Sequence, residues 1–316
     1  MREADAHTIS AEGITSWQLM ERAATKLFEW IKEHLPKERT VTVLAGTGNN
    51  GGDGLALARM LIADGWQVNT YLLCFSEHLS PDCQQNKELL EAQGIAIAEI
   101  RAEQVNNITY GKIVIDAVFG IGLYRLAPKW IQQIFENLNN SNSYILSVDM
   151  PSGLPTERIP SPEEIWVHPH QVLTFQTPKL PFFLPSTGCY IRKWEVLNIG
   201  LDEHFLKTLH PDFYYLESDI QQLQRRRAKF SHKGTYGHAL LVGGSYGKIG
   251  AVVLSGTAVL RAGAGLLTVA IPQCGYNILQ TALPEAMVLT CEEEKHYKTA
   301  EIPFTPSAVG VGIGWG

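Results

Sequence analysis

The segment over residues 46–54 combines glycine, asparagine and aspartate in a pattern suited to binding an anion. It reads Gly-Thr-Gly-Asn-Asn-Gly-Gly-Asp-Gly, with five glycines in nine positions. Glycine lets the backbone approach a ligand closely and adopt a positive φ. A helix that begins after such a turn points free N–H groups at the same place. We therefore expect an anion-binding loop here, in preference to a tight turn that binds nothing.

The same segment contains a Gly-x-Gly-x-x-Gly pattern at Gly46, Gly48 and Gly51, so a nicotinamide-dependent dehydrogenase is an alternative. Such enzymes place an acidic residue about 20 positions further on, where it holds a ribose hydroxyl. That position falls near Tyr71 here, and the first acid in the vicinity is Glu77. The missing acid weakens the dehydrogenase interpretation.

Two further aspartates each follow a β-rich run and precede a turn. Asp116 lies shortly before a Gly-Ile-Gly segment, and Asp149 is followed by Met-Pro-Ser-Gly, which includes Ser152. If these strands are neighbours, Asn50, Asp116 and Ser152 offer only oxygen ligands, which suit a hard cation better than zinc. Asp149 is then free for acid–base chemistry. Taken alone, Asp116 also fits a helix cap.

Strands that alternate with helices must position these loops. A helix is predicted over Ser16–His34, because Met20, Ala24, Leu27 and Ile31 share one face, with Ser16 as its cap. Strands are predicted at Val41–Ala45, Val68–Leu73, Lys112–Ile115, Tyr144–Val148 and Trp194–Ile199, and helices at Leu55–Ala63, Pro81–Gln93 and Lys129–Leu138. This alternation indicates an α/β fold with a mostly parallel sheet, whose reactive loops lie at the carboxyl ends of the strands.

A second βαβ pattern follows a polar tether over His210–Lys233. Its predicted elements are the strands His238–Val242 and Leu266–Ile271, the helix Val252–Ala262 and the strand-like Ala308–Val311. We place the boundary near Asp212, which gives domains over residues 1–212 and 213–316. Because the sequence stops inside a glycine-rich turn after a strand, we expect the second domain to be incomplete at Gly316.

Composition and charge exclude several classes of function. Hydrophobic residues make up 45% of the 316 residues and the formal net charge is −6, which argues against a nucleic-acid partner. The densest basic run, Arg225–Lys229, is typical of a solvated linker. Five cysteines without a CxxC pair indicate a reducing compartment. With no signal peptide and no apolar run of membrane-spanning length, we expect a cytoplasmic protein without a membrane partner.

At these loops the sequence resembles the epimerase domain of NAD(P)H-hydrate repair enzymes. The matching segments, in order within Met1–Leu201, are LMERAA, VLAGTGNNGGDG, VIDAVFGIGL and SVDMPSG. Further on, SHKGTYGHALLVGGS and GAVVLSGTAVLRAGAGLLTVAIP resemble the start of the family's dehydratase domain. The resemblance implies a Rossmann-like three-layer αβα domain followed by the opening of a ribokinase-like α/β domain.

The resemblance also implies an activity. NADH and NADPH that have taken up water form R and S hydrates at ring carbon 6, and the epimerase interconverts them. The dehydratase removes water from the S hydrate with ADP or ATP and magnesium. The hydrates would be the small-molecule partners of a homo-oligomer. The alternative is a non-catalytic nucleotide- or protein-binding scaffold on the same fold.

Site residues follow from the resemblance, motif by motif. Asp149 would be catalytic and would contact the hydrate. The other hydrate-binding residues would be Asn49, Asn50, Gly51, Gly52, Asp53, Gly120, Ile121, Gly122, Leu123, Tyr124, Arg125 and Leu126, with Ala251 and Gly314 in the second domain. Asn50, Asp116 and Ser152 would bind a potassium ion. The sequence lacks the Gly-Ser-Gly-Asp motif that holds nucleotide phosphates in ribokinase-like enzymes, so we expect epimerisation but no dehydration from these 316 residues alone.

Overall fold

The computed structural model describes residues 1–37, 39–122, 126–214, 227–299 and 301–315. Three of the expected hydrate-binding residues, Leu123, Tyr124 and Arg125, lie outside these ranges, as do Arg225 and Arg226 of the basic run. The chain divides into two compact units, Met1–Tyr214 and Tyr215–Gly316.

The first unit is built on a seven-stranded sheet in which every neighbouring pair is parallel. The strand order is β3-β2-β1-β4-β5-β6-β7. The strands are β1 (Val41–Ala45), β2 (Val68–Leu73), β3 (Ile97–Ile100), β4 (Ile113–Ala117), β5 (Tyr144–Val148), β6 (Gln171–Phe175) and β7 (Trp194–Leu197). The chain runs outward from β1 to β3 and then returns to the other side of β1. The direction therefore reverses between β1 and β4, where ligands bind in sheets of this kind.

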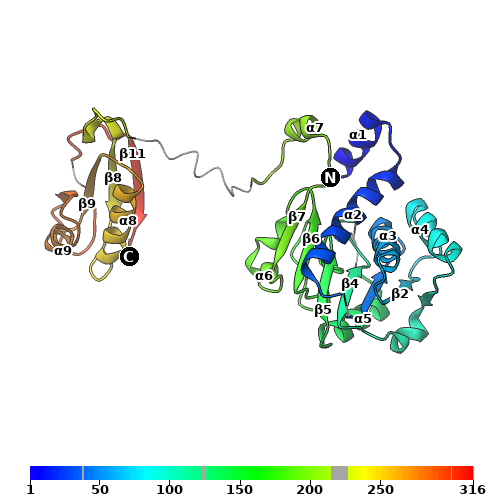
Figure 1. Ribbon diagram of the computed structural model, residues 1–316. Coiled ribbons are helices and arrows are strands. Elements are labelled where there is room, and N and C mark those ends of the chain that lie inside the picture. The colour runs from blue at the N-terminus through cyan, green and yellow to red at the C-terminus, as the bar shows by residue number, and fades with distance from the viewer. Residues whose placement is uncertain (38, 123–125, 215–226, 300, 316) are drawn as a thin grey trace. The chain divides into compact units, whose positions relative to one another are not determined.

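Helices cover both faces of this sheet, so the unit has three layers (Figure 1). They are α1 (Arg2–Glu12), α2 (Ser16–His34), α3 (Asn49–Ala63), α4 (Pro81–Ala92), α5 (Lys129–Asn139), α6 (Pro185–Gly188) and α7 (Glu203–Thr208), with the 3₁₀ turns η1 (Ala102–Asn107) and η2 (Leu180–Phe182). Successive strand residues point to opposite faces. Accordingly, Val43 belongs to one core with Leu27 and Leu57, whereas Leu44 belongs to a second core with Phe135. The expected three-layer α/β fold is confirmed.

The cap of one helix and the start of another differ from the sequence-based expectation. The cap of α2 is Thr15, not Ser16: the Thr15 hydroxyl accepts from the Gln18 N–H, and the Gln18 side chain accepts from the Thr15 N–H. The Ser16 hydroxyl instead donates to Asp82, 3.0 Å away. Helix α3 begins at Asn49, six residues before the expected start at Leu55. Its glycines are poor helix formers, so the sequence pattern alone indicated a loop.

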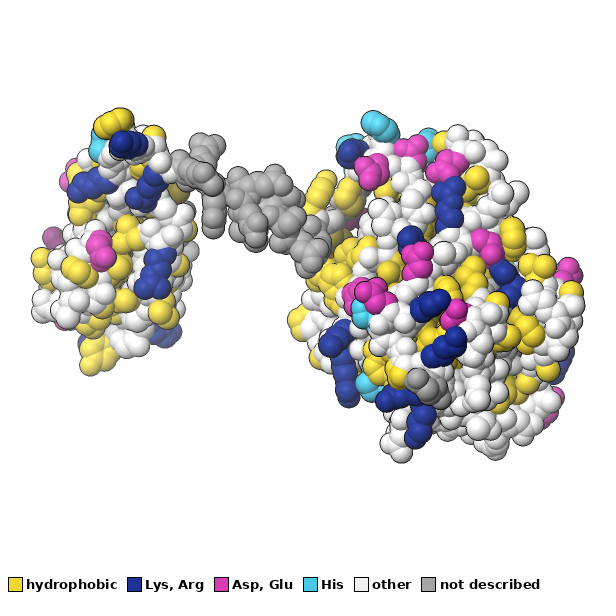
Figure 2. All heavy atoms as spheres, viewed as in Figure 1, with side chains coloured by type: hydrophobic (Ala, Val, Ile, Leu, Met, Phe, Trp, Pro, Cys, Tyr) yellow, Lys and Arg dark blue, Asp and Glu magenta, His cyan; other side chains and the backbone are white. Residues whose placement is uncertain are grey.

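The second unit holds a four-stranded parallel sheet in the order β10-β9-β8-β11. Its elements are η4 (Lys233–Tyr236), β8 (His238–Gly243), α8 (Ile249–Arg261), β9 (Leu266–Ile271), η5 (Gln273–Gly275), α9 (Tyr276–Ala282), β10 (Met287–Thr290) and β11 (Ala308–Ile313). One core packs Val252 of α8 and Leu279 of α9 against Val269. Apolar side chains also reach the surface of this unit (Figure 2), and Leu254 is 74% exposed.

Acidic and basic side chains are interspersed over the visible face of the first unit (Figure 2). Among the described residues, no helix combines the length and apolar character that a membrane crossing requires.

The loop that begins at Gly46 packs against the turn that follows β4, through close backbone contacts that only glycine permits. The Gly46 N–H donates to the Ala117 carbonyl at 3.0 Å. A Cβ on Gly46 would lie 2.0 Å from the Val118 carbonyl oxygen, and a Cβ on Gly51 would lie 1.8 Å from that of Gly46. By contrast, a Cβ on Gly48 would have no neighbour within 4 Å. The loop and the first turn of α3 are therefore packed against each other without room for a methyl group.

Gly51→Ala is expected to destabilise the first unit by about 1–3 kcal/mol, because the backbone must shift to admit the methyl group. Gly48→Ala is the matched control. It loses only the preference for glycine at a helix N-cap and should cost at most about 1 kcal/mol. Urea unfolding of the two variants gives the comparison. Equal stability of the two would contradict the tight packing of Gly51.

Candidate active site

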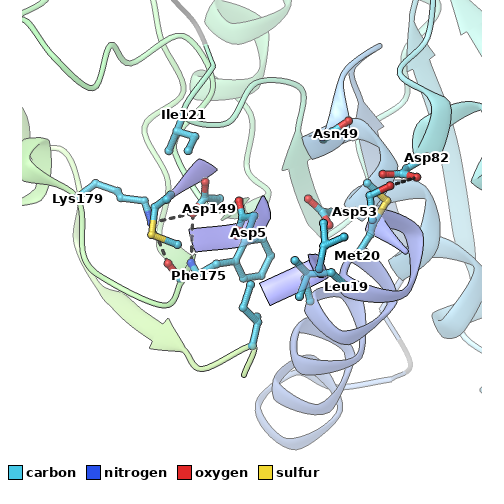
Figure 3. A pocket seen from close by; sticks show the side chains of 15 residues that line it. Asp5, Leu19, Met20, Asn49, Asp53, Asp82, Ile121, Asp149, Phe175 and Lys179 are labelled. Atoms are coloured by element: carbon cyan, nitrogen blue, oxygen red, sulfur yellow. Dashed lines mark hydrogen bonds and ion pairs between the residues drawn. The ribbon is translucent and has the colours of Figure 1, made fainter. Parts of the chain in front are cut away.

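Three loops meet at the carboxyl end of the first sheet, because the strands that precede them are neighbours. Leu44 of β1 pairs with Asp116 of β4, which pairs in turn with Ser147 of β5. A cleft of about 1080 Å³ lies at these loops. A smaller chamber of about 150 Å³ adjoins it, and the two share Asp5, Asn49, Asp53, Ile121, Asp149 and Phe175. Figure 3 shows the chamber with Asp149, Asp5 and Asp53 around it.

Most of the expected hydrate-binding residues of the first unit line this cleft. They are Asn49, Asn50, Asp53, Gly120, Ile121, Gly122, Leu126 and Asp149. Gly51 and Gly52 do not line it but lie buried behind its wall, where Gly52 packs against Met20 and Cys83. The two glycines allow α3 to pack closely against its neighbours. Residues beside them in the sequence, such as Asn50 and Asp53, line the cleft.

The Asp116 carboxylate is fully buried and ties two loops together. Its Oδ2 accepts from the Ser147 hydroxyl at 2.7 Å and from the Ser152 N–H at 2.9 Å. Its Oδ1 makes a longer contact of 3.5 Å with the Val118 N–H. Burial raises the pKa of Asp116, and these hydrogen bonds oppose the rise. The carboxylate is therefore incompletely compensated by its neighbours.

Asn50 and Ser152 border the turn that follows Asp116. The Ser152 hydroxyl oxygen accepts from the Phe119 N–H at 2.8 Å. Asn50 reaches the next residue, since a Cβ on Gly120 would lie 3.4 Å from its Oδ1. The Asn50 Nδ2 is buried and has no hydrogen-bond partner among the described residues. The Asp116 carboxylate, the Asn50 side-chain oxygen and the Ser152 hydroxyl offer only oxygen ligands, which suit a hard cation better than a zinc ion.

Asp149 adopts a left-handed backbone conformation, with φ of 61°, directly after β5. Aspartate is one of the few residues that visit this region, at a modest cost in energy. The conformation is held by the Asp149 N–H, which donates to the Leu173 carbonyl at 2.8 Å. It lets the Asp149 Oδ1 accept from the Thr174 hydroxyl and from the Phe175 N–H, both at 3.2 Å. The side chain is thus fixed at the cavity wall.

Lys179 completes this arrangement and was not anticipated from the sequence. Its side chain is 9% exposed, and its ammonium lies 3.1 Å from the Asp149 Oδ1. It also donates to the Thr174 hydroxyl and to the Phe175 and Thr177 carbonyls, each at 2.9 Å. A buried lysine without such partners would lose its charge. The signal in the sequence is one lysine flanked by the apolar segments Val172–Phe175 and Leu180–Phe183.

Two more carboxyl groups face the same space. Burial raises the pKa of Asp53 well above its usual range, and the nearby charges of Asp149, Asp5 and Asp82 add to the rise. Burial also raises the pKa of Asp5. Asp5 belongs to α1, a segment in which no motif marked a site. The cavity therefore holds two carboxyl groups with raised pKa values beside the Lys179–Asp149 pair, and perturbed pKa values of this kind are common in active sites.

In the second unit the two expected contact residues are neighbours. Gly314 has φ of 67°, and a Cβ on it would lie 3.4 Å from the Ala251 Cβ. The Gly314 carbonyl accepts from the Ser245 hydroxyl at 2.9 Å. The turn after β11 thus meets the first turns of α8.

The fold and the site together define a Rossmann-type α/β protein with a ligand cleft at the reversal point of its sheet. Residues 16–180 match the family described as YjeF-related protein N-terminus. Residues 239–316 match the family described as NAD(P)H-hydrate dehydratase. The chain therefore belongs to the family of YjeF-related proteins.

Individual relatives agree with this assignment. The bifunctional NAD(P)H-hydrate repair enzymes Nnr of Coxiella burnetii, Moorella thermoacetica and Escherichia coli are 31%, 32% and 30% identical over 96%, 93% and 91% of this chain. The matched part is 61%, 57% and 55% of these relatives, so the chain spans less than two thirds of their length. The crystal structure of the yeast protein ynu0 has a similar fold, with a TM-score of 0.54 and 24% identity over 69% of this chain and 94% of that one.

Lys179→Met is expected to lower the free energy of unfolding of the first unit by about 3–5 kcal/mol, because it leaves the Asp149 carboxylate buried without its cation. Adding Asp149→Asn should recover part of the loss, and the double-mutant cycle isolates the coupling. Lys26→Met is the control, because its pair with Glu29 is exposed and should contribute less than about 1 kcal/mol. If urea unfolding gave equal losses for the two lysine variants, the Lys179–Asp149 pair would have no special role.

Proposed function

We propose that this chain interconverts the R and S hydrates of NADH and NADPH. The main observation is that the Asp149 carboxylate is fixed by Lys179 where the large cleft meets the small chamber. Supporting this, relatives over more than nine tenths of the chain carry the name of NAD(P)H-hydrate repair enzymes. Asp149 acts as the catalytic residue, consistent with the fixed orientation of its side chain.

The two cavities match the two parts of such a substrate. Helix α3 has 15 residues, and its first turn lines the cleft through Gly48, Asn49 and Asn50. A helix N-terminus favours phosphate, so the diphosphate lies there. The hydrated ring enters the chamber, whose apolar wall includes Leu19 and Phe175.

Asp149 is suited to take the proton from the ring hydroxyl. Its Oδ1 is engaged by Thr174, Phe175 and Lys179, whereas its Oδ2 has no hydrogen-bond partner among the described residues. The free oxygen is therefore available to a substrate hydroxyl. The Lys179 ammonium lies 3.1 Å from the Asp149 Oδ1 and holds the side chain in place, and a carboxylate in such a position can act as a general base.

Potassium is the proposed cation at Asn50, Asp116 and Ser152. One carboxylate and two neutral oxygens carry less charge than a typical calcium site. A bound cation there supplies positive charge to the buried Asp116. The residues themselves hold the turn over Phe119 and Gly120 in place at the cleft wall.

We propose a coupled activity for the dehydratase domain to which the second unit is similar. Its match to the dehydratase family supports removal of water from the S hydrate with ADP or ATP and magnesium. Ala251 and Gly314 are the residues of this unit proposed to contact the hydrate, in line with their close approach. The epimerase would supply the S hydrate to this second reaction.

Asp149→Asn is expected to slow R-to-S exchange by roughly 10²–10⁴-fold, the range that general acid–base catalysis contributes. Hydrate binding should persist, because the amide keeps the shape of the side chain. The exchange is followed by chromatographic separation of the two hydrates. Asp212→Asn, which changes an exposed aspartate, should exchange at the rate of the unmodified chain.

Exchange at the full rate in Asp149→Asn would remove this residue from the mechanism. Hydrate binding without exchange in the unmodified chain would point instead to a non-catalytic binding protein on the same fold.

Potassium is expected to raise the melting temperature of the first unit above its value in the same concentration of choline chloride. A bound ligand stabilises by about 2.7 kcal/mol at 100 times its dissociation constant, and each kcal/mol raises the melting temperature by about 2–4 °C at this size. Ser152→Ala should reduce this increment. Asp212→Asn should keep it. The same melting temperature in both salts would exclude the cation site.

A further inference from the structure

Asp5 places a second carboxyl group at the junction of the cleft and the chamber. It is one of the residues that both cavities share, and Figure 3 shows its carboxylate between those of Asp149 and Asp53. The side chain is partly buried and has no hydrogen-bond partner among the described residues. It comes from α1, which lies before residues 16–180 of the family match. Its free carboxyl thus faces the ligand space.

Burial and the charges around Asp5 shift its pKa from that of an ordinary aspartate. Burial raises its pKa, and the Asp149 carboxylate adds to the rise, whereas the Met1 amino group and the Lys179 ammonium oppose it. Asp53 lines the same chamber, and Asp5 contributes to the raised pKa of Asp53. The net effect is a raised pKa for Asp5. Asp149, which lines the same cavity, has its Oδ1 3.1 Å from the Lys179 ammonium. A carboxyl group with a raised pKa beside a carboxyl group that is paired with a lysine suits the roles of acid and base.

We propose that Asp5 is a second catalytic residue, which exchanges a proton with the ring nitrogen while Asp149 exchanges one with the hydroxyl on carbon 6. The proposal rests on the epimerase activity proposed above. Asp5 is preferred over Asp53 because Figure 3 shows its carboxylate between those of Asp149 and Asp53, and because both Lys179 and Asp149 act on its pKa.

The chemistry of the hydrate explains why two groups are needed. Its carbon 6 carries a hydroxyl and is bonded to the ring nitrogen, so inversion can proceed by opening and closing the ring. Asp149 removes the hydroxyl proton, a carbon–oxygen double bond forms, and the bond from carbon 6 to nitrogen breaks. Its electron pair goes to nitrogen, which takes the proton of Asp5.

Ring closure reverses these steps on the other face of carbon 6. After rotation about the bond between carbons 5 and 6, Asp5 takes the proton back from nitrogen, whose electron pair attacks carbon 6. The carbonyl oxygen then recovers its proton from Asp149. Both aspartates regain their starting states, and no oxidant, reductant or additional water is consumed.

The test is the rate of R-to-S exchange across pH for Asp5→Asn, Asp5→Glu and the control Glu3→Gln, all in the full 316-residue chain. Glu3 lies on the same helix but is exposed. Asp5→Asn should lose roughly 10²-fold or more of the rate. The unmodified chain should lose activity as the pH rises through the pKa of Asp5, because the acid form is required. In Asp5→Asn that decline should be absent, and Asp5→Glu should restore most of the rate.

Glu3→Gln should match the unmodified chain. Circular dichroism and the melting temperature are compared for all variants, and a folded Asp5→Asn with an undiminished rate overturns the proposal. So does a reduced rate with an unchanged alkaline decline, because that result means that Asp5 is only structural. A chain that exchanges no hydrate at all, with Asp5 intact, overturns the epimerase function itself.

Discussion

The charge of Asp116 has no access to solvent, so the donors around it must be supplied by the protein. Those donors come from three places in the chain: the Ser147 hydroxyl inside β5, the Ser152 N–H after it and the Val118 N–H after β4. One carboxylate thereby fixes the distance between two loops. The loop after β1 is attached to the same region through Gly46, whose N–H donates to the Ala117 carbonyl. The cleft wall keeps its shape because these backbone segments have no freedom to separate.

Much of the fold could be predicted because strand and helix patterns in the first unit are strong. The expected bounds of β1, β2 and β5 agree with the structure, as do those of α2. The sequence pattern did not predict a strand where the local amino-acid composition is unfavourable for one. The strand β6 lies in a segment rich in proline and turn residues and was missed, and it forms because β5 and β7 pair with it on either side. Its carboxyl end then presents Phe175 to the site.

The candidate site was predictable only where a compact motif carried it. The loops with Asn49, Asp116 and Asp149 were identified, and the parallel sheet accounts for their meeting at one edge. Lys179 and Asp5 were not, because each is a single charged residue in a segment without a motif. Their importance arises from burial and from charges that lie far away in the sequence. Contacts between charges that are far apart in the sequence cannot be predicted from the spacing of residues along the chain.

The position of the first residue has a practical consequence. Met1 lines the small chamber together with Asp5 and Ile9. An affinity tag fused ahead of Met1 would therefore continue directly from the chamber wall. Kinetic constants measured on such a fusion would include steric and charge effects of the tag, and a polyhistidine sequence would add titrating imidazoles beside the carboxyl groups. A tag placed after the last residue of the chain, or one removed without residual residues, adds no atoms next to Met1.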